Sequence, residues 1–187
     1  VISVDSLPDD LRDTIRAHEE WMASFGAKGK RAVMDGAELD NVDFSGINLF
    51  GASLVGASMT GARFLGSSLN MTDLSGANLY KSKMDRAEMN GTNLSGADLT
   101  EASQSEADIS AADIKDRDGN STGRSWPANL TDANLSRSNL AAALLCGANL
   151  SGCNFNGANL RGADLSDSAI DGAKLQGAII TEAKLPS

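Results

Sequence analysis

The sequence predicts a repeat solenoid, and three observations indicate this fold class. An apolar residue recurs at every fifth position through most of the 187 residues, the residue two places before it is nearly always small, and the residue between them is often Asn or Asp. A period of five matches neither the helical nor the strand period. Each short unit can therefore bury its apolar residue only by stacking on neighbouring units.

We call the apolar residue of each unit the centre. Centres run at five-residue intervals from Met34 to Ile114 and from Leu130 to Leu185. Of these 29 positions only Gln104 is polar, and 20 of the 29 residues two places earlier are Ala. Residues two apart lie on one side of an extended segment, so the centre and the small residue should point inward and the Asn or Asp outward. Gln104 predicts a local distortion, in which its amide finds partners inside the tube or points outward.

Units such as Ala-Asn-Leu-Ser-Gly and Ala-Asp-Leu-Thr-Glu resemble those of the pentapeptide-repeat proteins, over about residues 32–114 and 128–185. The resemblance implies an all-β solenoid, a right-handed quadrilateral β-helix with four pentapeptides in each square coil. With coils spaced like strands, at about 4.8 Å, some seven coils would form a rod of about 35 Å.

The domain organisation follows from the two repeat blocks. Residues 1–31 form a lead-in and an N-terminal capping helix, and residues 32–114 form the first block of the β-helix. Residues 115–129 form an inserted loop, and residues 130–187 form the second block of one continuous domain.

The N-terminal pattern predicts an α-helix over about residues 7–25. Ser6 is the expected N-cap, Pro8 fits the first turn, and Gly26 and Gly29 supply the stop signal. One apolar face is expected, made of Leu7, Leu11, Ile15, Trp21, Met22 and Phe25. Such a helix would cover the first coil and block edge-to-edge growth.

The break between the blocks is interpreted as an eleven-residue insertion, because Ile114 and Leu130 are 16 residues apart and one unit accounts for five of them. With four units in each coil, this insertion places Phe155 on the face that carries Phe44 and Phe64. A coil shortened by four residues is the alternative.

The loop contains several candidate interaction residues. Asp116, Arg117 and Asp118 open it with the start of a calcium-loop pattern, but the later ligand positions do not match, so a turn built by Asp, Gly and Asn is the alternative. Arg124 and Trp126 close the loop, and an exposed Trp beside arginines would anchor a partner. A Trp folded back on the wall of the rod is the alternative.

Two outward apolar residues, Phe50 and Met71, are expected near each other on adjacent coils. They predict a contact patch. For Phe50, packing under the N-terminal helix is equally open.

The formal net charge is −9, and residues 32–114 carry a net charge of −8. This acidity argues against direct binding to nucleic acid or to an anionic membrane and favours a basic protein partner. Acidity that serves only solubility is the alternative.

No enzymatic chemistry is predicted. His18 is the single histidine, it lies on the expected capping helix, and no second metal ligand or nucleophile is spaced to work with it. The glycines follow the repeat instead of a phosphate-binding motif. Cys153 is expected to point inward and Cys146 outward, unpaired. We therefore expect no cofactor, no metal and no catalysis.

The sequence thus predicts a rigid, non-enzymatic scaffold for an unknown protein partner. The resemblance implies one specific alternative, because Qnr and MfpA-like members are acidic rods that mimic DNA, engage DNA gyrase and change quinolone sensitivity. A repeat domain of a larger effector or multidomain bacterial protein is a further alternative. We also expect a cytoplasmic location and a homodimer formed through the uncapped C-terminal end.

Overall fold

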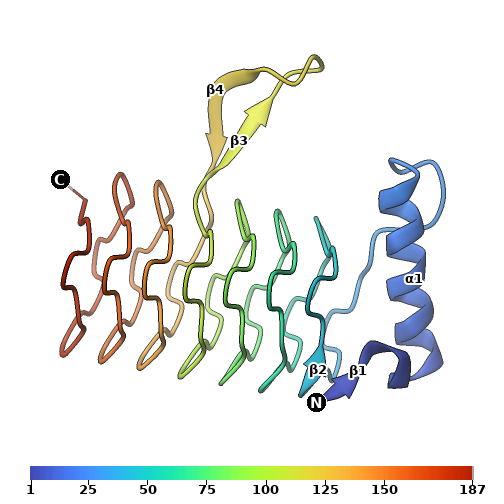
Figure 1. Ribbon diagram of the computed structural model, residues 1–187, viewed down its shortest axis with the longest axis horizontal. Helices are drawn as coiled ribbons and strands as arrows, with labels where there is room; N and C mark the ends of the chain where they lie inside the picture. Colours follow the sequence, from blue (N-terminus) through green and yellow to red (C-terminus); the bar gives the residue numbers. More distant parts are fainter. Residues whose placement is uncertain (187) are drawn as a thin grey trace.

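The protein is a solenoid of stacked coils, seen in a computed structural model that describes residues 1–186 (Figure 1). Residues 20 apart form parallel β-bridges, for example Ser53 with Asp73 and Asp73 with Asn93. The centres from Met34 to Ile109 and from Leu130 to Leu165 also bond across coils: the Leu74 N–H donates to the Asn93 carbonyl at 2.7 Å. Every coil contains four bridged positions five residues apart, so the predicted β-solenoid is confirmed.

Longer elements are few, because most bridged segments are single residues. The elements are β1 (Ile2–Ser3), a 3₁₀ turn η1 (Val4–Ser6), α1 (Asp9–Ala23), β2 (Val42–Asp43), β3 (Ala112–Lys115) and β4 (Ser121–Trp126). Strand β1 pairs in parallel with β2, and β3 pairs antiparallel with β4. None of the helices within residues 1–186 is long and apolar enough to cross a membrane.

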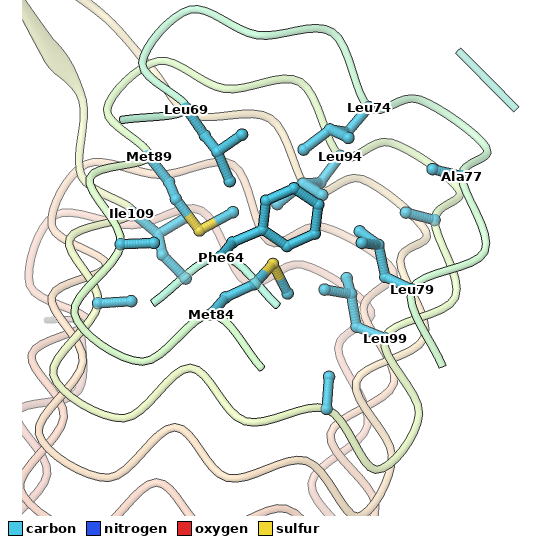
Figure 2. Packing of buried hydrophobic residues seen from close by; sticks show 14 of the residues in the cluster. Phe64, Leu69, Leu74, Ala77, Leu79, Met84, Met89, Leu94, Leu99 and Ile109 are labelled. Atoms are coloured by element: carbon cyan, nitrogen blue, oxygen red, sulfur yellow. The ribbon is translucent and has the colours of Figure 1, made fainter. Parts of the chain in front are cut away.

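The core is one continuous column of centres inside the tube. The centres from Met34 to Ile109 and from Leu130 to Leu165 are buried, as the inward assignment predicts. Figure 2 shows Leu and Met side chains from successive coils gathered around Phe64. The rings of Phe44 and Phe64 stack with centroids 5.2 Å apart.

The Asn and Asp residues before the centres have a structural role at the corners of the coil. At fourteen corners the side-chain oxygen accepts the backbone N–H two residues later, as Asp73 does from Ser75 at 3.0 Å. At five others, that N–H donates to an Asp or Asn of the preceding coil, as Thr60 does to Asp40 at 2.8 Å. Eight of the 25 acidic residues of this chain therefore satisfy backbone donors that the turns leave free.

Gln104 corrects one prediction. Its backbone keeps the regular pattern, with the N–H donating to the Asn139 carbonyl at 2.8 Å, so the coil is not distorted. The side chain is fully buried, and neither amide atom has a hydrogen-bond partner within residues 1–186. The repeat backbone holds Gln104 in the inward position, although its side chain finds no partner there.

The insertion is longer than expected, which corrects the role of Ile114. Bridge partners are 20 residues apart elsewhere but 36 apart across the insertion, where Asn93 bridges Asn129, so the insertion adds 16 residues. Leu130 therefore takes the inner position expected for Ile114, which instead pairs with Arg124 in the β3–β4 hairpin. The motif around Ile114 matches the repeat, but antiparallel pairing with β4 decides its place.

The longer insertion also moves Phe155 to another face. The bridge of Ser103 to Asn139 continues the ladder of Phe44 and Phe64 through Leu140, not Phe155. The expected alignment of the three Phe residues is therefore wrong, although Phe155 is buried as a centre.

Helix α1 lies across the N-terminal end of the solenoid (Figure 1). Its N-cap is Pro8, without a side-chain hydrogen bond, whereas Ser6 belongs to η1, so the expected capping box is wrong. Ile15 faces the core as expected, but Phe25 follows the helix in the left-handed region and is fully exposed. The turn that reverses the chain after α1 carries Phe25 away from the apolar face.

His18 connects α1 to the first coil. It is fully buried, its Nδ1 accepts the Ala32 N–H at 3.1 Å, and its ring stacks on Trp21 with centroids 5.5 Å apart. Since Nδ1 accepts a hydrogen bond, the ring is neutral with its proton on Nε2. Burial, and then the charge of Arg31, lowers the pKa of His18 below 6.5.

We expect the contact between α1 and the first coil to weaken at acid pH. The unfolded histidine binds a proton as pH falls through about 6.5, while the folded one resists it, so stability is full above that pH and is lost toward the lowered folded pKa. The measurement is Trp21 fluorescence against urea at pH 7.5 and 5.5 in a Trp126→Phe background. His18→Asn keeps an acceptor for the Ala32 N–H but cannot titrate, so it should lose part of this pH dependence; an unchanged profile would contradict the assignment.

The two cysteines are free and differ in environment. Cys153 is buried, its thiol donates to the Leu130 carbonyl at 2.9 Å, and burial raises its pKa to about 12. Cys146 is half-buried with a pKa raised mainly by desolvation. The predicted inward and outward placements are therefore confirmed.

We expect Cys153 to be inert toward thiol reagents in the native protein, because the thiolate is the reactive form. A native sample at pH 8 should show one slowly reacting thiol per chain with Ellman's reagent, and two in urea. Cys146→Ser should abolish the native signal. A native signal that survives this change would show that Cys153 is accessible.

Candidate protein-interaction surface

Three of the predicted interaction residues, Phe50, Met71 and Trp126, come together on one side of the solenoid. They line an open groove of about 730 Å³, which we call the hairpin groove. The exposed fractions of Phe50, Met71 and Trp126 are 39%, 38% and 56%. The full lining is Phe50, Asn70, Met71, Asn90, Ala111, Ala112, Asp113, Ile114, Lys115 and Trp126.

Coil stacking explains why these residues meet. Phe50 and Met71 lie at the same corner of successive coils, and the hairpin leaves the solenoid from this corner two coils later. Gly91 lies at that corner between them, with a left-handed φ of +66°. A Cβ on Gly91 would lie 2.6 Å from the Met71 sulfur and 3.3 Å from Trp126 Cδ1, so glycine leaves the space that both side chains occupy.

A second apolar depression adjoins the hairpin groove at the end of α1. We call it the α1 hollow, and it has a volume of about 270 Å³. Its lining is Trp21, Met22, Phe25, Gly26 and Phe50. Phe50 lines both depressions, so apolar surface continues from the end of α1 to the hairpin. Figure 1 shows the hairpin and that end of α1 on the same side of the solenoid.

The other predicted residues lie farther out on the hairpin. Asp116, Arg117 and Asp118 form its exposed tip, and Arg124 lies on exposed β4. The Asp116 carboxylate accepts the N–H groups of Asp118 and Asn120, both at 2.9 Å, and these bonds lower the pKa of Asp116. The tip is thus a turn built by an aspartate, and no group of three or more metal-ligating side chains occurs within residues 1–186.

Three carboxylates lie in or next to the hairpin groove. Asp113 lines it, Glu88 accepts a hydrogen bond from the groove residue Asn70 at 3.2 Å, and Asp108 accepts the N–H of Ser110 at the foot of the hairpin. Glu88 and Asp108 are bridge partners on adjacent coils. None of the three forms an ion pair with another residue of the described chain.

The sequence missed part of this surface. Ala112 and Ile114 match the repeat motif and were expected in the core, yet they line the hairpin groove. Asp113 and Lys115 beside them line it as well. No signal in the sequence separates Ala112 and Ile114 from true core residues, because only strand pairing with β4 removes them from the coil.

The last described coil exposes part of its core. The exposed fractions of Ile180 and Leu185 are 44% and 46%, whereas centres deeper in the solenoid are buried. Both occupy inward positions of the final units.

Comparison with solved structures finds several repeat proteins with limited superposition. HetL, a pentapeptide repeat protein involved in heterocyst differentiation regulation from Nostoc sp. strain PCC 7120, is 29% identical over 82% of this chain and 74% of its own, with a TM-score of 0.40. A pentapeptide repeat protein of the Arabidopsis thaliana thylakoid lumen is 22% identical over 72% and 69%, with a TM-score of 0.41. QnrB1, a plasmid-mediated fluoroquinolone resistance protein, is 20% identical over 82% of each chain, with a TM-score of 0.34.

The family comparison is decisive, although no curated protein matches the sequence. The model of pentapeptide repeats (8 copies) matches overlapping segments that together cover residues 30–116 and 128–185. These segments carry the bridged units of the solenoid and exclude most of the hairpin. The chain belongs to the pentapeptide-repeat family.

Proposed function

We propose that this protein is a non-enzymatic interaction scaffold that presents the hairpin groove to a protein partner. The observation that carries this proposal is the meeting of Phe50, Met71 and Trp126 on one exposed face. Large apolar side chains in a half-open depression are typical of interface anchors. The stacked coils below hold these anchors on a rigid support, so little conformational entropy is lost on binding.

Two finer features of the scaffold support this role. The four bridged positions in each coil support a square cross-section, in which each corner has a fixed place on the surface. The contacts of Ile15 and His18 with the first coil support a capping function for α1, which keeps the open backbone edge of that coil from pairing with other chains.

The test is site-specific photo-cross-linking in the source cells, with the photoreactive amino acid placed at Lys115 on the groove. The control places it at Arg86, which lines a different depression beside Asp85 and Glu106. We expect a discrete cross-linked protein from position 115 that is absent from position 86 and is lost when Met71→Gly is added. Equal products from both positions, or a product that Met71→Gly leaves unchanged, would contradict the proposal.

A second function, DNA mimicry toward DNA gyrase, is favoured by the unpaired acidity of the first block. Of the twelve carboxylates in residues 32–114, Glu101 and Glu106 are those that form ion pairs within the described chain. The others leave a negative field along the rod. Its test is gyrase supercoiling with and without a fluoroquinolone, for the intact protein and a variant lacking residues 116–125. Inhibition or drug protection that disappears with the loop would support mimicry, and no effect at micromolar protein would reject it.

Self-association through the C-terminal coil is the third part of the proposal, supported by exposed Ile180 and Leu185. Sedimentation velocity should show a dimer that Ile180→Asp dissociates. A monomer at 100 μM, on the order of the highest practical concentration, would reject it.

A further inference from the structure

The edge of strand β3 borders the hairpin groove. Five consecutive residues, 111–115, line the groove, although successive side chains of a strand point to opposite faces. A groove lined by every residue of a strand therefore follows the backbone edge. Within residues 1–186, β3 has one sheet neighbour, β4, so its outer edge carries backbone groups without a strand partner. Such an edge is a template for an added strand, and an isolated two-stranded hairpin is itself only marginally stable.

The hairpin groove holds an apolar side chain on a strained backbone. Met71 and Phe25 are the two large apolar residues with a left-handed φ, at +59° and +53°, and each lines one of the two adjoining depressions. At the corner position of Met71 the neighbouring coils have Gly51 and Gly91, which adopt this conformation without strain. The thioether is therefore held in the groove against a backbone preference for glycine.

The charge around the groove favours an occupant with positive charge. Glu88, Asp108 and Asp113 lie in or beside it without an ion-pair partner in residues 1–186, and Lys115 is the one cation of its lining. The whole chain carries a net charge of −9. Basic groups on an incoming segment would find unpaired carboxylates there.

We infer that the hairpin groove binds an extended, basic segment of a partner protein, which pairs with the free edge of β3 and packs apolar side chains against Met71 and Trp126. The inference rests on the proposed scaffold function and deepens it by specifying the partner's chemistry. Alternate side chains of the added strand point toward the groove floor, and lysine or arginine residues reach Glu88 and Asp108. Backbone hydrogen bonds supply affinity, and the apolar pocket and carboxylates supply specificity.

The test uses a displayed library of random 12-residue peptides selected against the full chain. We expect the enriched peptides to alternate apolar with other residues, to be net basic, and to bind at least tenfold more weakly to Met71→Gly and to Trp126→Ala. Met71→Gly removes the side chain while relieving backbone strain, so its melting temperature should be equal to that of wild type or higher. The matched control is Leu65→Gly, which removes an apolar side chain of similar exposed fraction, 39%, from a different depression and should leave binding within threefold.

Backbone pairing is tested with the best selected peptide after N-methylation of every second residue. Methylation in one phase removes the N–H groups that face β3 and should weaken binding at least tenfold, whereas the other phase faces solvent and should change it less than threefold. Equal effects of the two phases, acidic or helical consensus sequences, or no enrichment would overturn the inference. A wild-type dimer that Met71→Gly dissociates would also overturn it, because the occupant would then be a second copy.

These outcomes separate the inference from the proposed function. A cross-link at position 115 that depends on Met71, together with equal effects of the two methylation phases, leaves the scaffold in place and rejects strand addition. Loss of the cross-link itself rejects the scaffold.

Discussion

Replacing Leu94 with alanine is expected to lower the free energy of unfolding by about 2–5 kcal/mol. Leu94 is fully buried, and its coil lies between those of Leu74 and Leu130 on one inner ladder. In a tube this narrow the backbone is held by hydrogen bonds to the coils on both sides, so the cavity collapses little. Because each coil contacts only its neighbours, a central cavity weakens two interfaces. Urea denaturation followed by circular dichroism measures the loss, and Leu74→Ala should show a similar one.

Ser75→Ala is the matched control, since Ser75 follows Leu74 directly but lies at an outward corner. Its backbone N–H donates to Asp73, and this bond does not involve the hydroxyl. The substitution should change stability by no more than about 0.5 kcal/mol. Similar losses for Leu74→Ala and Ser75→Ala would show that the inward and outward assignment is wrong.

Gln104→Leu is expected to raise the free energy of unfolding by about 1–3 kcal/mol. The Gln104 amide is fully buried, and neither its nitrogen nor its oxygen has a partner within residues 1–186. Its ladder neighbours are Met84 and Leu140, so leucine completes an apolar column and removes the desolvation cost of two unsatisfied groups. Thermal and urea denaturation measure the gain.

Gln104→Glu is the control for this prediction, because it keeps the side-chain size but places a carboxyl group in the same apolar position. It should lower stability at pH 7, where a buried carboxylate is more costly than an amide. If Gln104→Leu instead left stability unchanged or lowered it, an internal water molecule would be satisfying the amide in the native tube.

The sequence by itself determined the repeat and its inner surface. A period of five with an apolar centre and a small residue two places before it is compatible with one stacking arrangement, and the buried residues from Met34 to Ile109 follow it. The outward position of Asn and Asp also followed from the pattern. Which N–H each of them accepts follows its place in the unit: Asp73, directly before its centre, accepts the N–H of Ser75 in its own coil, whereas Asp40, directly after its centre, accepts the N–H of Thr60 in the next coil. The second kind of bond exists only because stacking places residues 20 apart side by side.

The tertiary structure alone decided the insertion and the candidate interaction surface. Ile114 satisfies the repeat motif as well as Leu130 does, yet antiparallel pairing with Arg124 removes it from the coil. The local sequences of β3 and β4 do not predict this pairing. Phe50, Met71 and Trp126 were each visible as candidates, but their meeting depends on the corner register of three coils and on where the hairpin leaves the solenoid. A short repeat specifies its own core through local periodicity, whereas a surface built from separate coils depends on the stacking register, which a 16-residue insertion can shift without changing the repeat motif.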